Sequence, residues 1–413
     1  MRKIMASLDI GANALKLVVA ETVGEKLNIL GVSTIPNNTI KKGKIINKEE
    51  LVNKLKELFK DINDRLGFEV TKTLVIVPSS SAEFTLGTGK IDVKSEDGII
   101  TAEDIVSAVK KSAYHVVQDN MELVTIMPIN YTLEDGTKVL DPKNLISKTL
   151  EVKTVIISAL KSEVYDYLEC LEKINVDVVD IAFASIGDYF QFRNKEFDKQ
   201  VGAIINIGEQ TTCVSIINKG VLTNTSTTYL GGSNVTNDIA YIYKIDKEKA
   251  KDIKEEFALA HKRMAISAET INIKNKEEKN ISINQYEVSE VVESRLKEIL
   301  NLAKKQINIL TKKEISYIIL TGGVTETKDF NLVAESIFGK NVTLGNIHEL
   351  GVRNNIYSSV VGLIKWYDYN QKLKNREYSL LNIKEQEEFS KLSNGEELSS
   401  NGVIGKVFGY FFD

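Results

Sequence analysis

Three short glycine-containing segments each follow an apolar, strand-like run, and their chemistry is that of anion binding. They are DIGAN at 9–13, GEQTT at 208–212 and TGG at 321–323. Glycine lets backbone N–H groups approach an oxyanion closely, because no Cβ stands in the way. A fourth segment, GGSN at 231–234, precedes a helix that we expect to begin near Val235, and the amides at that start could bind phosphate as well. The four segments together predict a site for a phosphate-bearing ligand.

A glycine at the end of a strand is most often only a turn, so no single segment identifies a site. The first two segments, however, lie in matching contexts, LDIGANALKLVVAE and INIGEQTTCVSII, and this internal repeat favours binding. The chain has no GxxxxGK[ST] or GxGxxG motif between a strand and a helix, which argues against P-loop and dinucleotide-binding folds. Asp9, at the end of the first run, could hold Mg²⁺ through its water shell, since Mg²⁺ prefers one or two carboxylates.

The elements that would position these segments form two similar halves. Residues 3–35 predict three strands with tight turns, and 49–65 carry apolar residues at helical spacing. A second three-strand unit begins at Gly202, with helices expected over 245–260 and 286–307 and the intervening residues also read as helical. An apolar strand then ends at the TGG segment, before a helix over 355–371. A duplicated β-meander predicts an α/β protein with two related lobes.

The segment 84–159 interrupts the first half with a different character. It contains strand-like alternation, a turn at Asp97-Gly98, and a helix start at Thr101 with Asp104 at the capping-box position. Further strand-like runs follow. We therefore expect a small α+β insertion.

Bulk properties limit the class of protein. A chain of 413 residues is too long for one compact core, and its net charge of −4 provides no basic face for nucleic acid. Two cysteines and three histidines without ligand spacing argue against a zinc site or a disulfide framework and fit a reducing compartment. No apolar run reaches the roughly 18–20 residues that span a bilayer, and Asp9 interrupts the first run too early for a signal peptide. We expect the body of the protein in the cytosol.

The last residues predict a membrane contact. A polar stretch at 374–399 is typical of a linker, and 400–413 follow it. In a helix with 100° per residue, the apolar side chains of this segment lie on one face and Lys406 lies on the other. The expected membrane contacts are Val403, Ile404, Lys406, Val407, Phe408, Phe411 and Phe412. Packing on the protein's own core or in a partner's groove is the alternative. One lysine adds only about 1 kcal/mol on anionic lipid, so we expect a monomer to bind weakly and a row of copies strongly.

The chain resembles the superfamily of actin, sugar kinases and Hsp-type chaperones, with two phosphate motifs and an adenosine motif in the same order. Within it the resemblance is to FtsA, the family of bacterial cell-division actin homologues, and it extends over nearly the whole chain. It is carried by SLDIGANALKLVVAE, ITAEDI, MPINYTLEDG, GGSNVTNDIA, AKDIKEEFA, VESRLKEI, ILTGGV and SSVVGLIKWY. The resemblance implies an actin-like two-lobed α/β fold with duplicated mixed β-sheet cores, an inserted α+β subdomain and a C-terminal amphipathic helix.

The same resemblance implies how the chain is divided. The first-lobe core (1A) is expected at 1–83, 160–198 and 351–373, the inserted subdomain (1C) at 84–159, the second-lobe core (2A) at 199–236 and 304–350, the small subdomain of the second lobe (2B) at 237–303, the linker at 374–399 and the membrane-targeting helix at 400–413.

The resemblance also assigns residues. It implies that Lys254 lies beside the adenosine of a bound ATP. With the motifs above, the expected nucleotide contacts are Asp9 (also Mg²⁺, through water), Gly11, Ala12, Asn13, Lys16, Asn206, Gly208, Gln210, Thr211, Thr212, Gly231, Gly232, Ser233, Lys254, Gly322, Gly323 and Val324. Arg295 matches an arginine that would help to hold the tail of FtsZ, the tubulin-like partner, and Lys297 is a second expected contact with that tail. By spacing alone Arg295 is equally well explained as a helix charge paired with Glu298 or Glu293.

Four positions depart from the family pattern. The first turn has Ala12-Asn13 where a hydroxyl residue is usual, Asn206 and Cys213 stand where acidic residues are common, and Ala258 replaces a frequent glycine. Losing a carboxylate weakens the organisation of Mg²⁺ and water more than it weakens phosphate binding by amides. We therefore expect ATP binding with weak or no hydrolysis.

The implied function is that of a scaffold rather than an enzyme. Such a protein would bind ATP, polymerise, tether FtsZ filaments to the cytoplasmic face of the cell membrane at the division site, and contact later division proteins through the inserted subdomain. One alternative is another membrane-linked actin-fold scaffold, of the pilus-assembly type. The other is a sugar-kinase-like phosphotransferase, which needs a carboxylate base that no aspartate of the second hairpin supplies.

Overall fold

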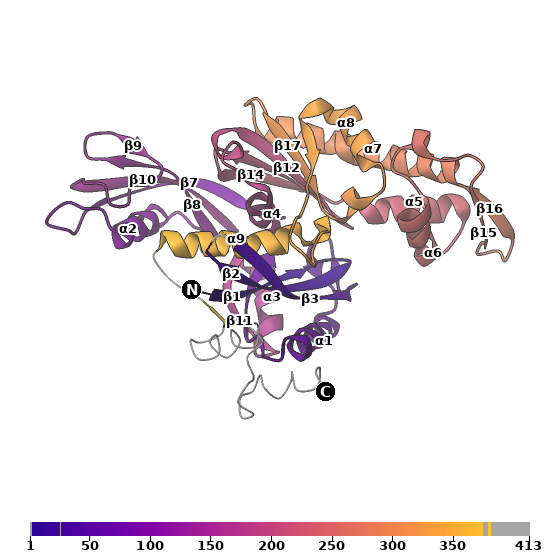
Figure 1. The fold of residues 1–413 in the computed structure, drawn as a ribbon, viewed down its shortest axis with the longest axis horizontal. Helices are drawn as coiled ribbons and strands as arrows, with labels where there is room; N and C mark the ends of the chain where they lie inside the picture. The colour runs from indigo at the N-terminus through magenta and orange to yellow at the C-terminus, as the bar shows by residue number, and fades with distance from the viewer. Residues whose placement is uncertain (1, 25, 375–378, 381–413) are drawn as a thin grey trace. The chain divides into compact units, whose positions relative to one another are not determined.

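The protein is described from a computed structural model, which places residues 2–24, 26–374 and 379–380. The chain divides into two compact units (Figure 1). Among the described residues, the first comprises 2–24, 26–191, 348–353, 359–374 and 379–380, and the second comprises Phe192–Ile347 and Asn354–Ser358.

The first unit is built on a five-stranded mixed sheet in the order β11-β6-β1-β2-β3. Its strands are β1 (Arg2–Ile10), β2 (Ala14–Val23), β3 (Lys26–Pro36), β6 (Lys72–Val77) and β11 (Asp177–Phe183). Strands β1, β2 and β3 form an antiparallel meander, whereas β6 and β11 add in parallel on the other side of β1. The three strands expected over 3–35 are therefore present.

Within the described residues, four helices belong to this sheet: α1 (Lys48–Leu66), α3 (Lys161–Glu172), α4 (Ala184–Phe192) and α9 (Ser358–Leu373). A short hairpin of β4 (Ile40–Lys41) and β5 (Lys44–Ile45) precedes α1. The side chain of Asn47 caps α1 by accepting from the amide of Glu50, and Gly67 ends the helix in the left-handed conformation. Helices α4 and α9 approach closely through Gly187 and Gly362.

An inserted α+β unit follows β6, as expected. It contains β7 (Glu83–Asp92), α2 (Ala102–Ser112), β8 (Met121–Leu133), β9 (Lys138–Val139) and β10 (Thr149–Leu160). The strands form a four-stranded antiparallel sheet in the order β7-β10-β8-β9. The predicted capping box of Thr101 and Asp104 begins α2, whose buried side chains pack on a small apolar core.

The second unit repeats the plan of the first in a sheet ordered β14-β13-β12-β17-β18. Its strands are β12 (Val201–Ile207), β13 (Thr212–Asn218), β14 (Val221–Thr228), β17 (Tyr317–Thr321) and β18 (Val342–Leu344). Again three strands form an antiparallel meander and two add in parallel. The duplication predicted from the sequence is thus present strand by strand.

The rest of the second unit is mostly helical. It comprises α5 (Gly232–Tyr243), α6 (Lys247–Asp252), a π-helical turn (Ile253–Phe257), α7 (Gln285–Leu310) and α8 (Phe330–Phe338), with 3₁₀ turns at Phe197–Lys199, Lys262–Met264, Gly323–Glu326, Gly339–Asn341 and Asn355–Tyr357. The reading of the residues between the two expected helices as helical is wrong. They form a hairpin of β15 (Thr270–Lys274) and β16 (Asn280–Asn284).

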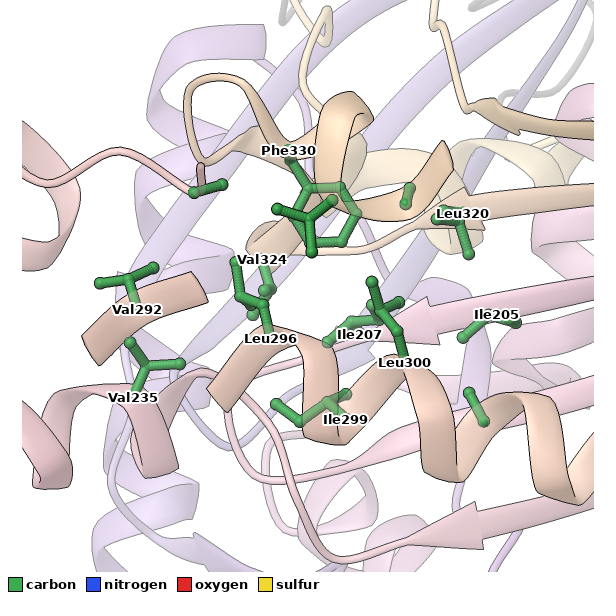
Figure 2. Packing of buried hydrophobic residues seen from close by; sticks show 14 of the residues in the cluster. Ile205, Ile207, Val235, Val292, Leu296, Ile299, Leu300, Leu320, Val324 and Phe330 are labelled. Atoms are coloured by element: carbon green, nitrogen blue, oxygen red, sulfur yellow. The ribbon is translucent and has the colours of Figure 1, made fainter. Parts of the chain in front are cut away.

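The core of the second unit lies between its sheet and α7 (Figure 2). Leu296, Ile299 and Leu300 of α7 are buried in the same cluster as Ile205 and Ile207 of β12. Val324, just beyond β17, belongs to the cluster too. Close-packed interiors resist movement, so this core fixes the carboxyl ends of β12 and β17, where the glycine turns begin.

The last described residues are tied to β1. The Ile4 amide donates to Ser379 Oγ at 3.0 Å, and the Leu380 amide donates to the Ile4 carbonyl at 2.8 Å. Most of the expected linker at 374–399, and all of the helix expected at 400–413, lie outside the described residues. Among the helices that the structure describes, none combines the length and hydropathy needed to cross a membrane.

Candidate functional site

The first glycine turn joins β1 to β2. The Gly11 amide donates to the Ala14 carbonyl at 3.1 Å, and a Cβ at Gly11 would lie only 2.8 Å from that same oxygen. Asn37, directly after β3, supports the turn by donating through Nδ2 to the Gly11 carbonyl at 2.8 Å and through its backbone amide to the Asn13 carbonyl at 2.8 Å. The turn is held on both sides, and glycine is the residue that its backbone geometry admits.

Asp9 and Lys16 lie directly opposite each other in the register of β1 and β2. Their side chains form an ion pair, with Lys16 Nζ 2.6 Å from Asp9 Oδ2, and both are largely covered. Lys16 could bind a phosphate, and Asp9 could hold Mg²⁺. Among the described residues no three potential metal-ligating side chains gather. One carboxylate fits Mg²⁺ all the same, because this ion takes its remaining ligands from water and nucleotide phosphates.

The second turn, between β12 and β13, repeats the hydrogen bond of the first. The Gly208 amide donates to the Thr211 carbonyl at 2.9 Å, as Gly11 does to Ala14. Asn206 lies opposite Cys213 in the strand register, and the Cys213 sulfur lies 3.0 Å from Thr225 Oγ1. The two positions where the family pattern favours carboxylates are therefore neighbours, occupied here by an amide and a thiol.

Helix α5 is attached to the second turn through its first amides. The Gly232 amide donates to the Gly208 carbonyl at 3.0 Å, and the Ser233 amide donates to the Glu209 carbonyl at 2.7 Å. The helix begins at Gly232, three residues before the expected start at Val235. Two of the amides that we expected to bind phosphate therefore donate to backbone carbonyls of the turn. A contact of Gly232 or Ser233 with a ligand would have to involve atoms other than these N–H groups.

The third turn, after β17, lies against the end of β12. Gly322 has a φ of 93°, and a Cβ there would lie 2.6 Å from Asn206 Oδ1 and 2.5 Å from the Ile207 carbonyl. Only glycine combines this left-handed backbone with so close an approach. The turn continues into the short helix that contains Val324.

Lys254 lies in the π-helical turn at Ile253–Phe257 and is 8% exposed. Such turns are frequent at functional sites, because they displace a side chain from the helical register. Its Nζ lies 3.5 Å from the Gly232 carbonyl, 3.6 Å from Glu209 Oε2 and 3.8 Å from Glu255 Oε1. All three distances exceed the roughly 2.7–3.2 Å of a strong N–H···O bond, so this buried ammonium group retains capacity for a ligand.

Four segments of the second unit meet at Gly232. A Cβ at Gly232 would lie 2.7 Å from Glu209 Oε2, 3.1 Å from Val324 Cγ2 and 3.4 Å from Lys254 Nζ. The structure therefore brings together five of the expected nucleotide contacts, Gly208, Gly231, Gly232, Lys254 and Val324, and it adds Glu209. Glu209 lies within the GEQTT segment but is not among the contacts expected from the sequence.

Arg295 and Lys297 lie elsewhere in the second unit, on α7. Arg295 binds Asp238 of α5 with two hydrogen bonds, of 2.6 and 2.9 Å, and also pairs with Glu298. Lys297 Nζ lies 2.6 Å from Glu293 Oε1. The alternative prediction, that Arg295 pairs with a carboxylate of its own helix, is thus confirmed for Glu298. The pairing with Asp238 of α5 was not predicted from the sequence. Any acidic ligand of these residues would have to compete with carboxylates of the chain itself.

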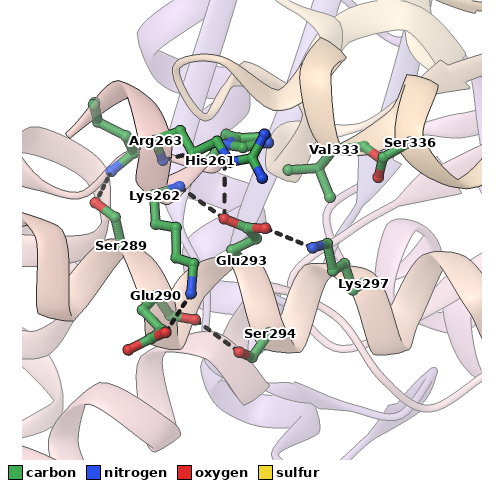
Figure 3. Close-up of polar contacts among 11 residues, drawn as sticks. His261, Lys262, Arg263, Ser289, Glu290, Glu293, Ser294, Lys297, Val333 and Ser336 are labelled. Atoms are coloured by element: carbon green, nitrogen blue, oxygen red, sulfur yellow. Dashed lines mark hydrogen bonds and ion pairs between the residues drawn. The ribbon is translucent and has the colours of Figure 1, made fainter.

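A polar ladder on α7 holds the segment 257–266 (Figure 3). Ser289 Oγ accepts from the Leu259 amide at 2.9 Å, and Glu293 Oε2 accepts from the Lys262 amide at 2.8 Å. Burial opposes the ionisation of Glu293, but hydrogen bonds from Lys297 and from the Lys262 amide outweigh it and lower the pKa of the carboxyl below its usual value. Met264, within the segment, is exposed. The result is a mixed basic and apolar surface beside α7.

Residues 203–362 match the family model described as cell division protein FtsA, and residues 80–158 match the one described as the SHS2 domain inserted in FTSA. Residues 137–266 match the model of the type IV pilus assembly protein PilM.

Full-length relatives agree with these matches. The chain is 26% identical over 378 residues to cell division protein FtsA of Bacillus subtilis, covering 91% of this chain and 86% of that protein. It is 24% identical to FtsA of Enterococcus hirae, covering 89% and 83%.

Among solved structures, a PilM–PilN type IV pilus biogenesis complex gives a TM-score of 0.60 at 14% identity, covering 87% of this chain and 97% of that one. MreB5 of Spiroplasma citri bound to AMPPNP gives 0.56 at 13% identity, covering 90% and 97%. These likenesses confirm the actin-like fold expected from the sequence.

Proposed function

We propose that this chain, which belongs to the FtsA family of cell-division proteins, is an ATP-binding scaffold that assembles with copies of itself and tethers FtsZ filaments to the cell membrane. The observation that carries the nucleotide part is the convergence on Gly232 of the second turn, Lys254 and Val324. Segments that are distant in sequence meet there around a residue without a side chain, and a buried cation lies beside it.

ATP is the ligand whose chemistry fits these groups. In the second unit the backbone of the glycine turns would lie against the anionic part, Lys254, which the resemblance places beside the adenosine, would offer its ammonium group to the neighbouring phosphate, and Val324 would offer an apolar contact for the base. In the first unit the ammonium group of Lys16 would be a ligand for phosphate. Asp9 would hold Mg²⁺, which neutralises phosphate charge when it is bound. The fold supports the proposal, because MreB5, with the same fold, has been solved with AMPPNP.

Hydrolysis should be slow. A rapid nucleotide hydrolase positions water and metal with carboxylates near the transferred phosphate. Asn206 and Cys213 occupy adjacent places on β12 and β13, and neither provides a carboxylate. The scaffold would therefore change state by binding nucleotide, with turnover well below the roughly 1 s⁻¹ at the low end of typical enzymes.

The surface beside α7 is the proposed site for the FtsZ tail. Lys297 is 43% exposed at its side chain, and Met264 and Ile266 present apolar groups next to the exposed Arg263. Basic and apolar groups together suit an extended peptide that carries both acidic and apolar residues. Arg295 would contribute only after exchanging a carboxylate partner, because Asp238 and Glu298 already bind it.

Membrane attachment is proposed for the residues after Leu380. The described chain ends beside β1 of the first unit, and the polar stretch that follows could act as a tether for the aromatic terminal segment. Single copies should bind lipid weakly, and assembled copies strongly.

A pilus-assembly scaffold is the second candidate. It is favoured by the match of residues 137–266 to the PilM model and by the likeness to the PilM–PilN complex. The insertion matched as the SHS2 domain of FTSA favours the division scaffold instead.

Flotation of FtsZ with lipid vesicles separates the two candidates. The full chain should carry FtsZ to the top of the gradient, whereas a chain ending at residue 399 should not. FtsZ without its C-terminal tail is the matched control and should stay at the bottom. Flotation of tail-less FtsZ, or of FtsZ with the shortened chain, would refute the tethering role.

A further inference from the structure

The carboxylate of Glu209 occupies the point at which the candidate nucleotide residues of the second unit meet. Its Oε2 lies 2.7 Å from the position that a Cβ would take on Gly232 and 3.6 Å from Lys254 Nζ. The space left by the missing side chain of Gly232 is therefore filled by an anionic group of the chain itself.

Only the side chain of Glu209 can leave this position easily. Its backbone is fixed, because its carbonyl accepts the Ser233 amide at 2.7 Å. Its side chain is 23% exposed, so rotation about its own bonds can carry the carboxylate toward solvent. Lys254, at 10% side-chain exposure, has no comparable freedom.

A polyphosphate and this carboxylate cannot share the site at low cost. Both are anions, and like charges at close range repel, most strongly where water is partly excluded. Both would also use the same buried cation, since a lone buried ammonium group is costly without a partner.

We propose that Glu209 is an internal competitor of the nucleotide, pairing with Lys254 in the empty site and rotating away when ATP binds. This inference rests on the proposed binding of ATP at this site. It makes Glu209 a residue that lowers affinity, and it makes the effect larger for ATP than for adenosine, because the phosphates carry the charge.

Calorimetric titration of the full-length protein tests this competition. Mg·ATP and adenosine are each titrated into the wild type, Glu209→Gln, Lys254→Met and the double variant. Glutamine keeps the shape and an acceptor for Lys254 but removes the charge. At an effective dielectric constant of about 20, removing one unit charge roughly 10 Å from another changes a binding constant on the order of tenfold. We therefore expect Glu209→Gln to bind Mg·ATP about tenfold more tightly than the wild type. The gain should be smaller for adenosine and smaller in the Lys254→Met background.

The outcomes separate this inference from the function on which it rests. Wild-type binding of Mg·ATP with no tightening in Glu209→Gln would overturn the competition and leave ATP binding intact. A lower unfolding temperature in Glu209→Gln without tighter binding would show that the pair is only structural, which also overturns it. Absence of Mg·ATP binding in every protein would refute the nucleotide proposal and this inference together.

Discussion

Replacing Glu293 by alanine removes one of the α7 side chains that hold the segment 257–266, together with Ser289 and Gln285. Glu293 is 6% exposed at its side chain and accepts from the Lys262 amide at 2.8 Å and from Lys297 Nζ at 2.6 Å. A net hydrogen bond to a charged group contributes about 1.5–3 kcal/mol, whereas a pair with a half-exposed lysine adds at most about 1 kcal/mol. We therefore expect Glu293→Ala to lower the free energy of unfolding of the second unit by about 2–4 kcal/mol.

Glu290 provides a matched control on the same helix. Its side chain is 51% exposed and also pairs with Lys262, through Nζ. An exposed pair of this kind contributes about 0–1 kcal/mol, so Glu290→Ala should change stability little. Urea denaturation gives the free energies, and hydrogen exchange of the Leu259 and Lys262 amides reports the segment directly. Equal effects of the two substitutions on both measurements would refute the proposed role of Glu293 in holding the segment 257–266 on α7.

The pH dependence adds a second test of the same residue. The folded state lowers the pKa of Glu293 below its ordinary value of 4.5. The ionised carboxylate therefore makes its full contribution to the free energy of unfolding above about pH 4.5, and this contribution is lost as the pH falls through the folded-state pKa. The stability difference between the wild type and Glu293→Gln should shrink as the solution is acidified below that value. A difference that stays constant or grows on acidification would contradict the assigned direction.

Three further substitutions test the packing. A Cβ at Gly362 would lie 1.8 Å from the Gly187 carbonyl, so Gly362→Ala should cost on the order of 3 kcal/mol in denaturant unfolding; an unchanged midpoint would contradict the close α4–α9 contact. A Cβ at Gly231 would lie 2.4 Å from the Gly208 carbonyl, and Gly231→Ala should lower the unfolding temperature even without nucleotide. Thr101→Ala removes one half of the α2 capping box and should cost about 1 kcal/mol, seen as faster amide exchange in α2.

Local sequence signals predicted the elements whose boundaries depend on nearby residues. Asn47 caps α1 and Asn284 caps α7, so each helix begins within two residues of its expected start. The hairpin of β15 and β16 also has a local signal, because isoleucines alternate with polar residues in TINIK and NISIN. This period of two indicates strands, and it differs from the helical reading because each run is only five residues long and lies between helical patterns.

The candidate site could be predicted only in part, because its key contacts join distant segments. Glycine motifs identified the turns, and family likeness identified Lys254. The meeting of Glu209 with Lys254 depends on how the turn after β12 packs against a π-helical turn 45 residues later, which no short pattern encodes. The pairing of Arg295 with Asp238 spans 57 residues in the same way.

Titration of Mg·ATP into the wild type and Gly232→Ala tests the central claim most directly. The alanine methyl would meet the mobile carboxylate of Glu209 rather than backbone, so the variant should fold with little change in unfolding temperature. The methyl would, however, fill the space where Lys254 and Val324 converge. We predict one ATP per wild-type chain and clearly weaker binding to the folded variant. No binding to the wild type, or equal affinity of both proteins, would contradict a nucleotide site at Gly232.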